Sequence, residues 1–166
     1  MKPMSVGLVG LGTVAQGTLN VLANKREELG RRVGRDIQIT HVGARRDRDE
    51  VDLSQVKVSR NLMDVALDPE VEIFVELIGG CDYALELIEA AIDSGKHVVT
   101  ANKALIAEHG NALFEKAQAR GVTIAFEASV AGGIPVIKAL REGLAANQIG
   151  WLAGMLGVGP FPVLID

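Results

Sequence analysis

The sequence predicts an α/β protein with a doubly wound, mostly parallel sheet of the Rossmann type, and three observations support that fold. An apolar stretch, VGLV at 6–9, ends in the glycine bend Gly10-Leu11-Gly12. Strand-like and helix-like stretches then alternate along the chain. We find no repeat, low-complexity segment or linker before about residue 148. Such alternation is typical of βαβ units, in which helices cover a parallel sheet.

Length and composition indicate one soluble domain. The chain has 166 residues, of which 48% are hydrophobic and 23% charged, and its formal net charge is −4. This charge argues against nucleic acid or an anionic membrane as a partner. The single cysteine, Cys81, excludes an internal disulfide. Because the start MKPMSVGLVG leaves no room for a signal peptide and no apolar run approaches the ~20 residues of a membrane span, we expect a cytoplasmic protein.

The glycine bend has the pattern of a dinucleotide-binding turn. A strand over 6–9 precedes it, and a helix predicted over 13–29 follows it. Gly10 permits the tight turn, Gly12 lets the backbone approach a diphosphate, and Ala15 is small enough for helix and strand to pack closely. Amides at the start of the helix then face the phosphates. The alternative is a glycine turn in some other α/β protein.

The second predicted strand, over 37–42, addresses the choice of cofactor. It leads into Arg45, Arg46 and Asp47. An acidic residue at this position usually binds the ribose 2′-hydroxyl of NAD, whereas a guanidinium pairs with the 2′-phosphate of NADP. The two arginines favour NADP, and Asp47 keeps NAD open. The alternative is a surface loop in which the arginines pair with Asp47 and Asp49 and have no role in cofactor binding.

The remaining elements complete the alternation and place five turns at one edge. We predict strands over 56–59, 71–78, 97–100 and 122–126, and helices over 61–67, 82–94, 110–120 and 134–146. Ligands of doubly wound sheets bind at the carboxyl ends of the strands. The turns at Gly10, Arg45, Gly79, Asn102 and Glu127 all follow carboxyl ends, so we expect them to share one crevice.

Lys103 is the candidate catalytic residue. It follows the strand over 97–100 and precedes a helical stretch, where a cation is electrostatically unfavourable. A local rule broken at the carboxyl end of a strand indicates function. A partly desolvated lysine beside a nicotinamide can move a proton to or from a substrate oxygen. The alternative is a lysine that is simply exposed to solvent.

Two carboxylates invite a closer look. Glu127 opens the small, flexible loop over 127–133, whose carbonyls could hold a monovalent cation, although the residues alone favour a simple turn. Glu76 is a polar residue within an otherwise apolar strand. Its side chain is therefore either paired or directed to an edge.

The histidines and the cysteine carry less information. His41, His97 and His109 do not have metal-ligand spacing, and we expect His97 to be structural. Cys81 follows two glycines and could touch a cofactor, but a small buried hydrophobic residue is the simpler interpretation. Neither a Ser-His-Asp set nor a P-loop is evident in the sequence.

Three motifs resemble one enzyme family. The segments VELIGG at 75–80, GKHVVTANKALIAEHG at 95–110 and FEASVAGGIPVI at 126–137 follow the glycine bend in order. Together they are similar to homoserine dehydrogenase over about residues 4–156. The resemblance implies NAD(P)-dependent interconversion of L-homoserine and L-aspartate 4-semialdehyde in threonine and methionine synthesis, and a homo-oligomeric enzyme.

The resemblance also implies site residues. Lys103 falls on the family's lysine near nicotinamide and substrate, which is implicated in proton transfer. A sodium ion is implied at Glu127, Val130, Gly132 and Ile134. The cofactor-binding residues implied are Gly10, Leu11, Gly12, Thr13, Val14, Ala15, Arg45, Arg46, Ile78, Gly79, Gly80 and Lys103.

Two departures from the family pattern matter. Ala15 replaces a common glycine, which we expect to have little effect because alanine is also small. The family continues into a substrate domain, whereas residues 157–166 read GVGPFPVLID. We therefore expect a dinucleotide-binding domain over 1–148 and the start of a truncated or altered substrate and dimerisation domain over 149–166. Such a chain would bind cofactor with little turnover alone. The alternatives are another NADP-dependent carbonyl or semialdehyde reductase and a non-catalytic nucleotide-binding module.

Overall fold

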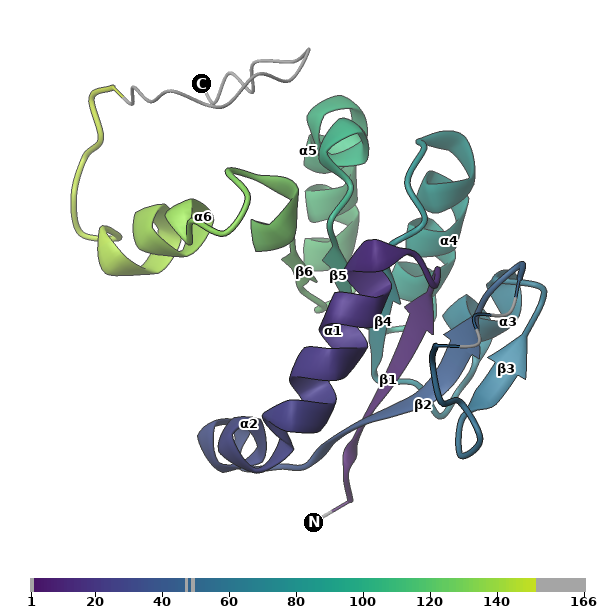
Figure 1. Ribbon diagram of the computed structural model, residues 1–166. Helices are drawn as coiled ribbons and strands as arrows, with labels where there is room; N and C mark the ends of the chain where they lie inside the picture. Colours follow the sequence, from purple (N-terminus) through teal and green to yellow (C-terminus); the bar gives the residue numbers. More distant parts are fainter. Residues whose placement is uncertain (1, 47, 49, 152–166) are drawn as a thin grey trace.

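A parallel sheet organises the computed structural model, which describes residues 2–46, 48 and 50–151 (Figure 1). In this described part the strand order is β3-β2-β1-β4-β5-β6, and every pair of neighbours is parallel. The order reverses between β1 and β4, which is the switch point of a doubly wound sheet. The predicted fold class is confirmed. The strands are β1 (Met4–Val9), β2 (Ile37–Gly43), β3 (Lys57–Ser59), β4 (Ile73–Glu76), β5 (His97–Thr100) and β6 (Ile124–Ala125).

Helices lie on both faces of the sheet. Figure 1 shows α1 crossing one face, with α4 and α5 behind the other and α6 extending away beyond β6. Among the described residues no helix is long and apolar enough to cross a membrane. The helices are α1 (Thr13–Asn24), α2 (Arg26–Val33), α3 (Met63–Leu67), α4 (Asp82–Asp93), α5 (Lys103–Ala119), the 3₁₀ turn η1 (Glu127–Ser129), α6 (Val136–Lys138) and the π-helical turn η2 (Ala139–Gly143).

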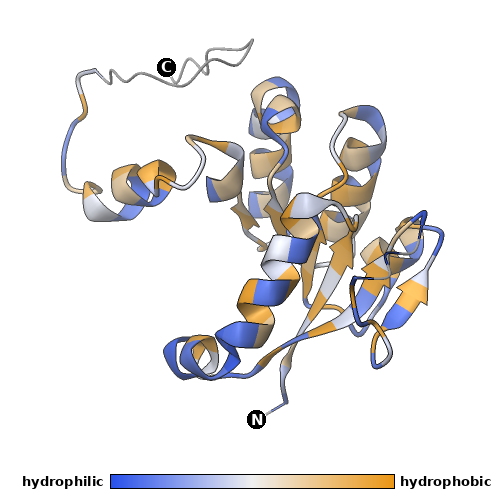
Figure 2. Cartoon of the chain, viewed as in Figure 1, coloured by the Kyte–Doolittle hydropathy of each residue, from blue (hydrophilic) through white to orange (hydrophobic). Residues whose placement is uncertain are grey.

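Two apolar clusters hold these layers together. The larger one packs α3, α4 and α5 against the sheet around the fully buried Phe74. The smaller one packs α1 against the other face through Leu8 and Ala15, both fully buried. Figure 2 shows the hydrophobic colour concentrated on the strands and on the helix faces that meet them. Burial of this apolar surface is the main favourable term in folding. The packing also holds the strands in position, and with them the edge at which their carboxyl ends lie.

Two predicted helices have different bounds in the structure. The helix expected over 13–29 is broken at Lys25, whose ψ of 14° is not helical, and α2 begins at the next residue. The helix expected over 110–120 begins seven residues earlier, at Lys103. The Asn102 side chain accepts a hydrogen bond from the Leu105 amide and so caps it. Gly110 is not a start signal but a buried position within α5, close to Phe114.

Two further elements are shorter than predicted. The strand expected over 71–78 is limited to Ile73–Glu76. The Leu77 amide still bonds Val9, but the amides of Ile78 and Gly79 turn to the Glu76 carboxylate. The helix expected over 134–146 is limited to α6 and η2. Residues 149–151 have no regular structure, and the rest of the segment assigned to a second domain, 152–166, lies outside the described residues.

Candidate functional site

The glycine bend after β1 is tightly built. Gly10 has φ of +99°, and a Cβ atom there would lie 2.7 Å from the Leu77 carbonyl oxygen, so only glycine fits. The Gly10 amide donates to the Gly43 carbonyl at 2.8 Å, and the Leu77 amide donates to Val9 at 3.0 Å. The bend is thus fixed between the ends of β2 and β4.

Gly12 marks the open side of the same bend. It precedes α1 without a side-chain cap, and a Cβ atom there would meet nothing within 4 Å. The first amides of α1 therefore face open space, and an uncapped helix start favours an anion. Thr13 and Val14 are exposed in this first turn, whereas Ala15 is fully buried against the sheet, as the third position of the fingerprint requires.

A cavity of about 420 Å³ adjoins the bend. Across it, the Arg45 guanidinium lies 5.9 Å from the centre of the Tyr83 ring, within cation–π distance. The cavity therefore combines open backbone amides, positive charge and an aromatic ring. Its lining residues are Gly10, Leu11, Gly12, Gly43, Ala44, Arg45, Arg46, Arg48, Leu62, Leu77, Ile78, Gly79 and Tyr83.

The arginine loop is anchored by the edge strand. The Ala44 amide donates to the Ser59 carbonyl at 3.0 Å, and the Arg60 side chain donates to the Ala44 carbonyl at 3.1 Å. Ala44 is thereby clamped beside Arg45. Asp47 and Asp49, which entered the alternatives for cofactor choice and for arginine pairing, lie outside the described residues.

A chain of polar groups around the buried His41 supports β2 and β3 beneath this loop. The ring of His41, only 1% exposed, bonds Asp68 Oδ2 at 2.7 Å and Ser59 Oγ at 2.8 Å, and Lys57 Nζ donates to the same Asp68 oxygen at 2.9 Å. Burial alone raises the pKa of Asp68, but hydrogen bonds from Lys57, the Glu70 amide and His41 outweigh it and lower the pKa to about 2. The sequence shows no Ser-His-Asp set because these residues are far apart along the chain.

The turn after β4 is held by Glu76, which sequence analysis left as paired or edge-directed. The Glu76 side chain is fully buried and accepts from the amides of Ile78 at 2.8 Å and Gly79 at 3.2 Å. Gly79 and Gly80 both have positive φ, of +71° and +77°. Glu76 is therefore paired.

Lys103 is the first residue of α5, and its side chain is exposed. No acidic residue occupies the first turn of that helix, so the unfavourable position of this cation is confirmed. Asn102 ties it to the neighbouring turn, because its side-chain amide donates to the Gly80 carbonyl at 2.6 Å. Lys103 therefore directly follows a residue that contacts the turn at 78–80.

The predicted residues divide between two cavities rather than sharing one. Lys103 and Val130 line a second cavity, of about 710 Å³, between α5 and the segment with α6. Leu11, Arg45, Arg46, Ile78, Gly79 and the two fingerprint glycines line the first. Thr13, Val14, Ala15, Gly80, Glu127, Gly132 and Ile134 line neither of these two.

The Glu127 side chain has a structural task. Its two carboxylate oxygens accept from the amides of Ile137 at 2.9 Å and Lys138 at 2.8 Å, which caps α6. The Glu127 carbonyl accepts from Val130, and the Ile134 carbonyl from Val136. Within the described residues no three His, Cys, Asp or Glu side chains gather as a metal site.

Cys81 lies beside the first cavity without lining it, and two residues that do line it were not predicted. Cys81 is half-buried at the start of α4, outside the lining of the first cavity; partial burial, then the Glu108 carboxylate, raise the pKa of its thiol. Sequence reasoning missed Arg48 and Tyr83, which line that cavity. Arg48 continues the basic run at 45–46 and could have been found; Tyr83, one turn beyond the glycine pair, had no such signal.

Comparison with known proteins places this geometry in a family. Residues 10–127 match the model described as homoserine dehydrogenase, NAD binding domain. The chain is 56% identical over 162 residues to a homoserine dehydrogenase of Pseudomonas aeruginosa, covering 97% of this chain and 37% of that protein. A homoserine dehydrogenase of Neisseria gonorrhoeae is 47% identical, with 94% of this chain and 36% of that protein covered.

Solved structures agree with the sequence relatives. A homoserine dehydrogenase from Thiobacillus denitrificans superposes with a TM-score of 0.82 at 54% identity, covering 88% of this chain and 34% of that one. The chain thus spans little more than a third of the length of the curated relatives it matches. Since the family model covers well over half of this chain, the chain belongs to the homoserine dehydrogenase NAD-binding domain family.

Proposed function

We propose that this chain is the nucleotide-binding part of an NADP-dependent homoserine dehydrogenase, which interconverts L-homoserine and L-aspartate 4-semialdehyde. The observation that carries the proposal is the bend from Gly10 to Gly12, closed on its Leu77 side and open beyond Gly12, at the uncapped start of α1. That arrangement presents amides to a diphosphate. The family match supplies the class of reaction.

The residues on either side of the bend have separate binding roles in this proposal. Amides of Leu11 to Ala15 hold the diphosphate. The turn at 78–80, whose Ile78 and Gly79 amides are already bonded to Glu76, contacts the nicotinamide side. Arg45 and Arg46 pair with the 2′-phosphate, since a guanidinium forms strong charge-assisted hydrogen bonds to phosphate. NADP is therefore favoured over NAD. Tyr83, opposite Arg45, offers a ring face to the adenine.

Lys103 is the proposed proton carrier. When bound, the nicotinamide cofactor supplies or accepts the hydride. In homoserine oxidation Lys103 Nζ accepts the hydroxyl proton, and in semialdehyde reduction it returns a proton to the carbonyl oxygen. Its exposed place at the start of α5 leaves the side chain free to meet a substrate. The segment 149–166 is the proposed start of a substrate domain, and residues 1–148 alone would turn over little because they do not fix both reactants.

The expected sodium ion fits the described loop less well. Both oxygens of the Glu127 carboxylate already accept backbone amides, and the Ile134 carbonyl accepts Val136. A cation at this loop would therefore have to share these oxygens with the amides that already donate to them. Sodium therefore stays a prediction and has no step in the proposed reaction.

Self-association and a cytoplasmic location complete the proposal. Trp151 is 82% exposed and Ile149 45% exposed at the end of the described chain, and two exposed apolar side chains so close in sequence suit a contact with another molecule. The proposed partner is a second copy, and analytical ultracentrifugation of the chain and of Trp151→Ala would compare their masses. The proposed reaction consumes soluble metabolites and a soluble cofactor, which suits the cytoplasm.

Calorimetric titration with NADP and with NAD tests the binding role. We expect NADP to bind more tightly. Arg45→Ala with Arg46→Ala should weaken NADP binding by roughly 10- to 100-fold and leave NAD binding nearly unchanged, because each lost charged hydrogen bond costs about 1.5–3 kcal/mol. Arg31→Ala, an exposed arginine on α2, is the matched control and should change neither. Equal affinities in all variants would overturn the preference for NADP.

An exchange of segments tests the reaction. Residues 1–151 would replace the corresponding third of the Pseudomonas aeruginosa relative, and homoserine-dependent formation of NADPH would be followed by absorbance. Lys103→Ala should lower the rate by roughly 100- to 10,000-fold, the usual contribution of a proton-transfer group. Lys138→Ala, an exposed lysine of α6, should retain it. A folded, NADP-binding hybrid in which Lys103→Ala keeps its activity would contradict the assigned role.

A further inference from the structure

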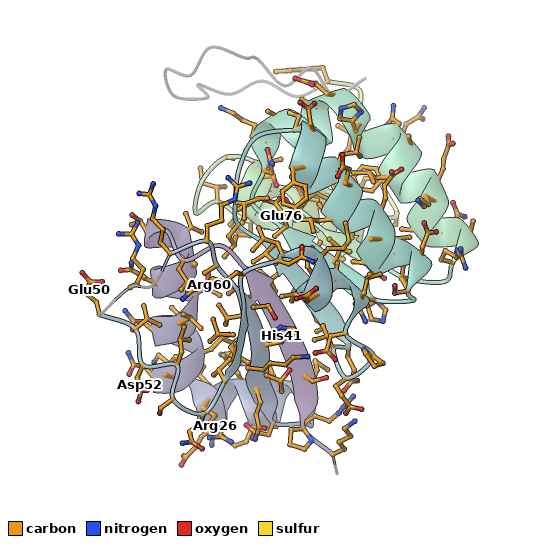
Figure 3. The ribbon with its side chains drawn as sticks, turned by 90° about the vertical axis from the view of Figure 1, so that its right-hand side faces the viewer. Arg26, His41, Glu50, Asp52, Arg60 and Glu76 are labelled. Atoms are coloured by element: carbon orange, nitrogen blue, oxygen red, sulfur yellow. The ribbon has the colours of Figure 1, made fainter. Side chains whose placement is uncertain are left out.

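Glu76 accepts hydrogen bonds from two different strand ends. Its Oε1 accepts the amides of Ile78 and Gly79, at the turn after β4. Its Oε2 accepts the hydroxyl of Thr100, the last residue of β5, at 2.6 Å. Glu76 and Thr100 are both fully buried. Figure 3 shows Glu76 inside the molecule, between the strands and the helices packed on them.

Thr100 links Glu76 to the start of α5 through hydrogen bonds. Its hydroxyl accepts the Asn102 amide at 3.0 Å while donating to Glu76. The Asn102 side chain donates to the Gly80 carbonyl at 2.6 Å and accepts the Leu105 amide at 3.2 Å. Ser129 Oγ donates to the Thr100 carbonyl at 2.9 Å. One continuous network therefore joins the turn at 78–80 to the first turn of α5, which begins with Lys103.

The chemistry of this network selects a carboxylate at position 76. Three donors surround the two oxygens, and a carboxylate is the side chain that only accepts. A glutamine would turn its NH₂ group toward either the amides or Thr100, and a donor would lose its partner. Burial of a carboxylate is costly, and an apolar side chain often serves stability as well or better. Geometry, rather than stability, is then the reason for this residue.

We propose that Glu76 is a positioning residue that couples the cofactor turn at 78–80 to Lys103 through Thr100 and Asn102. The inference rests on the proposed function, because it takes the turn as a nucleotide contact and Lys103 as the proton carrier. A nucleotide that orders the turn would shift the start of α5 through this network. Glu76 itself touches neither substrate nor cofactor in this account.

Backbone NMR of the ¹⁵N-labelled chain, with and without saturating NADPH, tests the coupling. In the wild type we expect NADPH to shift the amides of residues 10–12 and also those of 102–105. In Glu76→Gln and in Thr100→Val the first set should still shift, whereas shifts of the second set should fall below about a third of the wild-type size. Thr100→Ser keeps the hydroxyl and should restore them.

The control is a buried polar residue at the opposite edge of the sheet. Ser5, 5% exposed, bonds Glu70 and Glu72 near the amino ends of the strands. Ser5→Ala should leave both sets of shifts unchanged. The inference is overturned if shifts at 102–105 persist in Thr100→Val, or if Ser5→Ala abolishes them equally; should Glu76→Gln not fold, Thr100→Val decides.

The two proposals fail in different ways. Absence of NADPH-induced shifts at 10–12 in the wild type would refute the proposed function, and the coupling with it. Shifts at 10–12 without any at 102–105 in the wild type would refute the coupling alone and leave the nucleotide site intact.

Discussion

Two carboxylates with little exposed surface support the sheet on either side of the glycine bend, and they do so by different means. Asp68 lies on the side of β2 and β3, where it bonds the cationic Lys57 and the ring of His41. Glu76 lies on the side of β4 and β5, where it bonds only neutral backbone amides and the Thr100 hydroxyl. Figure 3 labels His41 and Glu76 in separate parts of the molecule.

The difference matches the tasks of the two sides. Asp68 draws on charge, which suits a support that must hold β3, an edge strand of three residues, close to β2. Glu76 draws on direction, since each oxygen is matched to particular donors. Both sets of hydrogen bonds are short, but attraction between charges depends little on angle, whereas a hydrogen bond from a neutral donor depends strongly on it. We therefore expect Asp68 to hold β3 against β2 mainly through charge, and Glu76 to fix the orientation of the backbone before Lys103.

Substitution of the glycines in the bend between the two sides has the largest expected effect on stability and on binding. Gly10→Ala forces a side chain into positive φ and against the Leu77 carbonyl, and should cost about 2–5 kcal/mol of unfolding free energy. Gly12→Ala meets open space and should cost less than about 1 kcal/mol. Yet it should weaken NADP binding roughly 10- to 100-fold by blocking the approach of the diphosphate.

Urea unfolding and calorimetry on the same preparations check this pair. Stability lost in Gly10→Ala and binding lost in a stable Gly12→Ala is the expected pattern. A stable Gly10→Ala protein, or a Gly12→Ala protein with wild-type affinity, would show that the two glycines do not have separate tasks.

Glu76→Gln breaks the directional support. At least one buried donor loses its partner, so the free energy of unfolding should fall by about 1–3 kcal/mol. Glu70→Gln, an exposed residue that pairs with Lys2, is the control and should change stability by less than about 0.5 kcal/mol. Chemical denaturation measures both. Equal midpoints for Glu76→Gln and the wild type would mean that the directional match does not contribute to the free energy of unfolding.

The charged support should be visible in the pH dependence of stability. The pKa of Asp68 is about 2 in the folded chain, below its ordinary value of 3.8, so its contribution is complete above that ordinary value. As the pH falls from about 4 toward 2, we expect a loss of about 2 kcal/mol from this group. Asp68→Asn should flatten that part of the curve. An unchanged slope in this variant would contradict the pairing.

Sequence reasoning predicted the parts of the site that depend on local pattern. The strand, the glycine bend and the helix at 6–15 follow from residue type and spacing, and the position of Lys103 at a strand end was also expected. The family resemblance is confirmed by the comparisons. These features need only neighbours along the chain.

Features that depend on distant residues could not be predicted. Glu76 was recognised as unusual, but its partner Thr100 lies in another strand. For Glu127 the residues favoured a simple turn and the resemblance implied a cation, but neither predicted that its carboxylate accepts the amides of Ile137 and Lys138. The start of α5 was placed late, because the Asn102 cap was not recognised beside Lys103 and Gly110 was mistaken for a boundary. Hydrogen bonds between residues far apart in the sequence decided the first two cases, whereas the Asn102 cap is local and was overlooked.

A crystal structure of the chain with NADP bound is the most direct measurement of the central claim. The account predicts phosphate oxygens of the diphosphate within hydrogen-bond distance of amides in the first turn of α1, beyond Gly12, with the 2′-phosphate beside Arg45 or Arg46. A diphosphate bound in the cavity between α5 and α6, or a nucleotide held without contact to the first turn of α1, would contradict it.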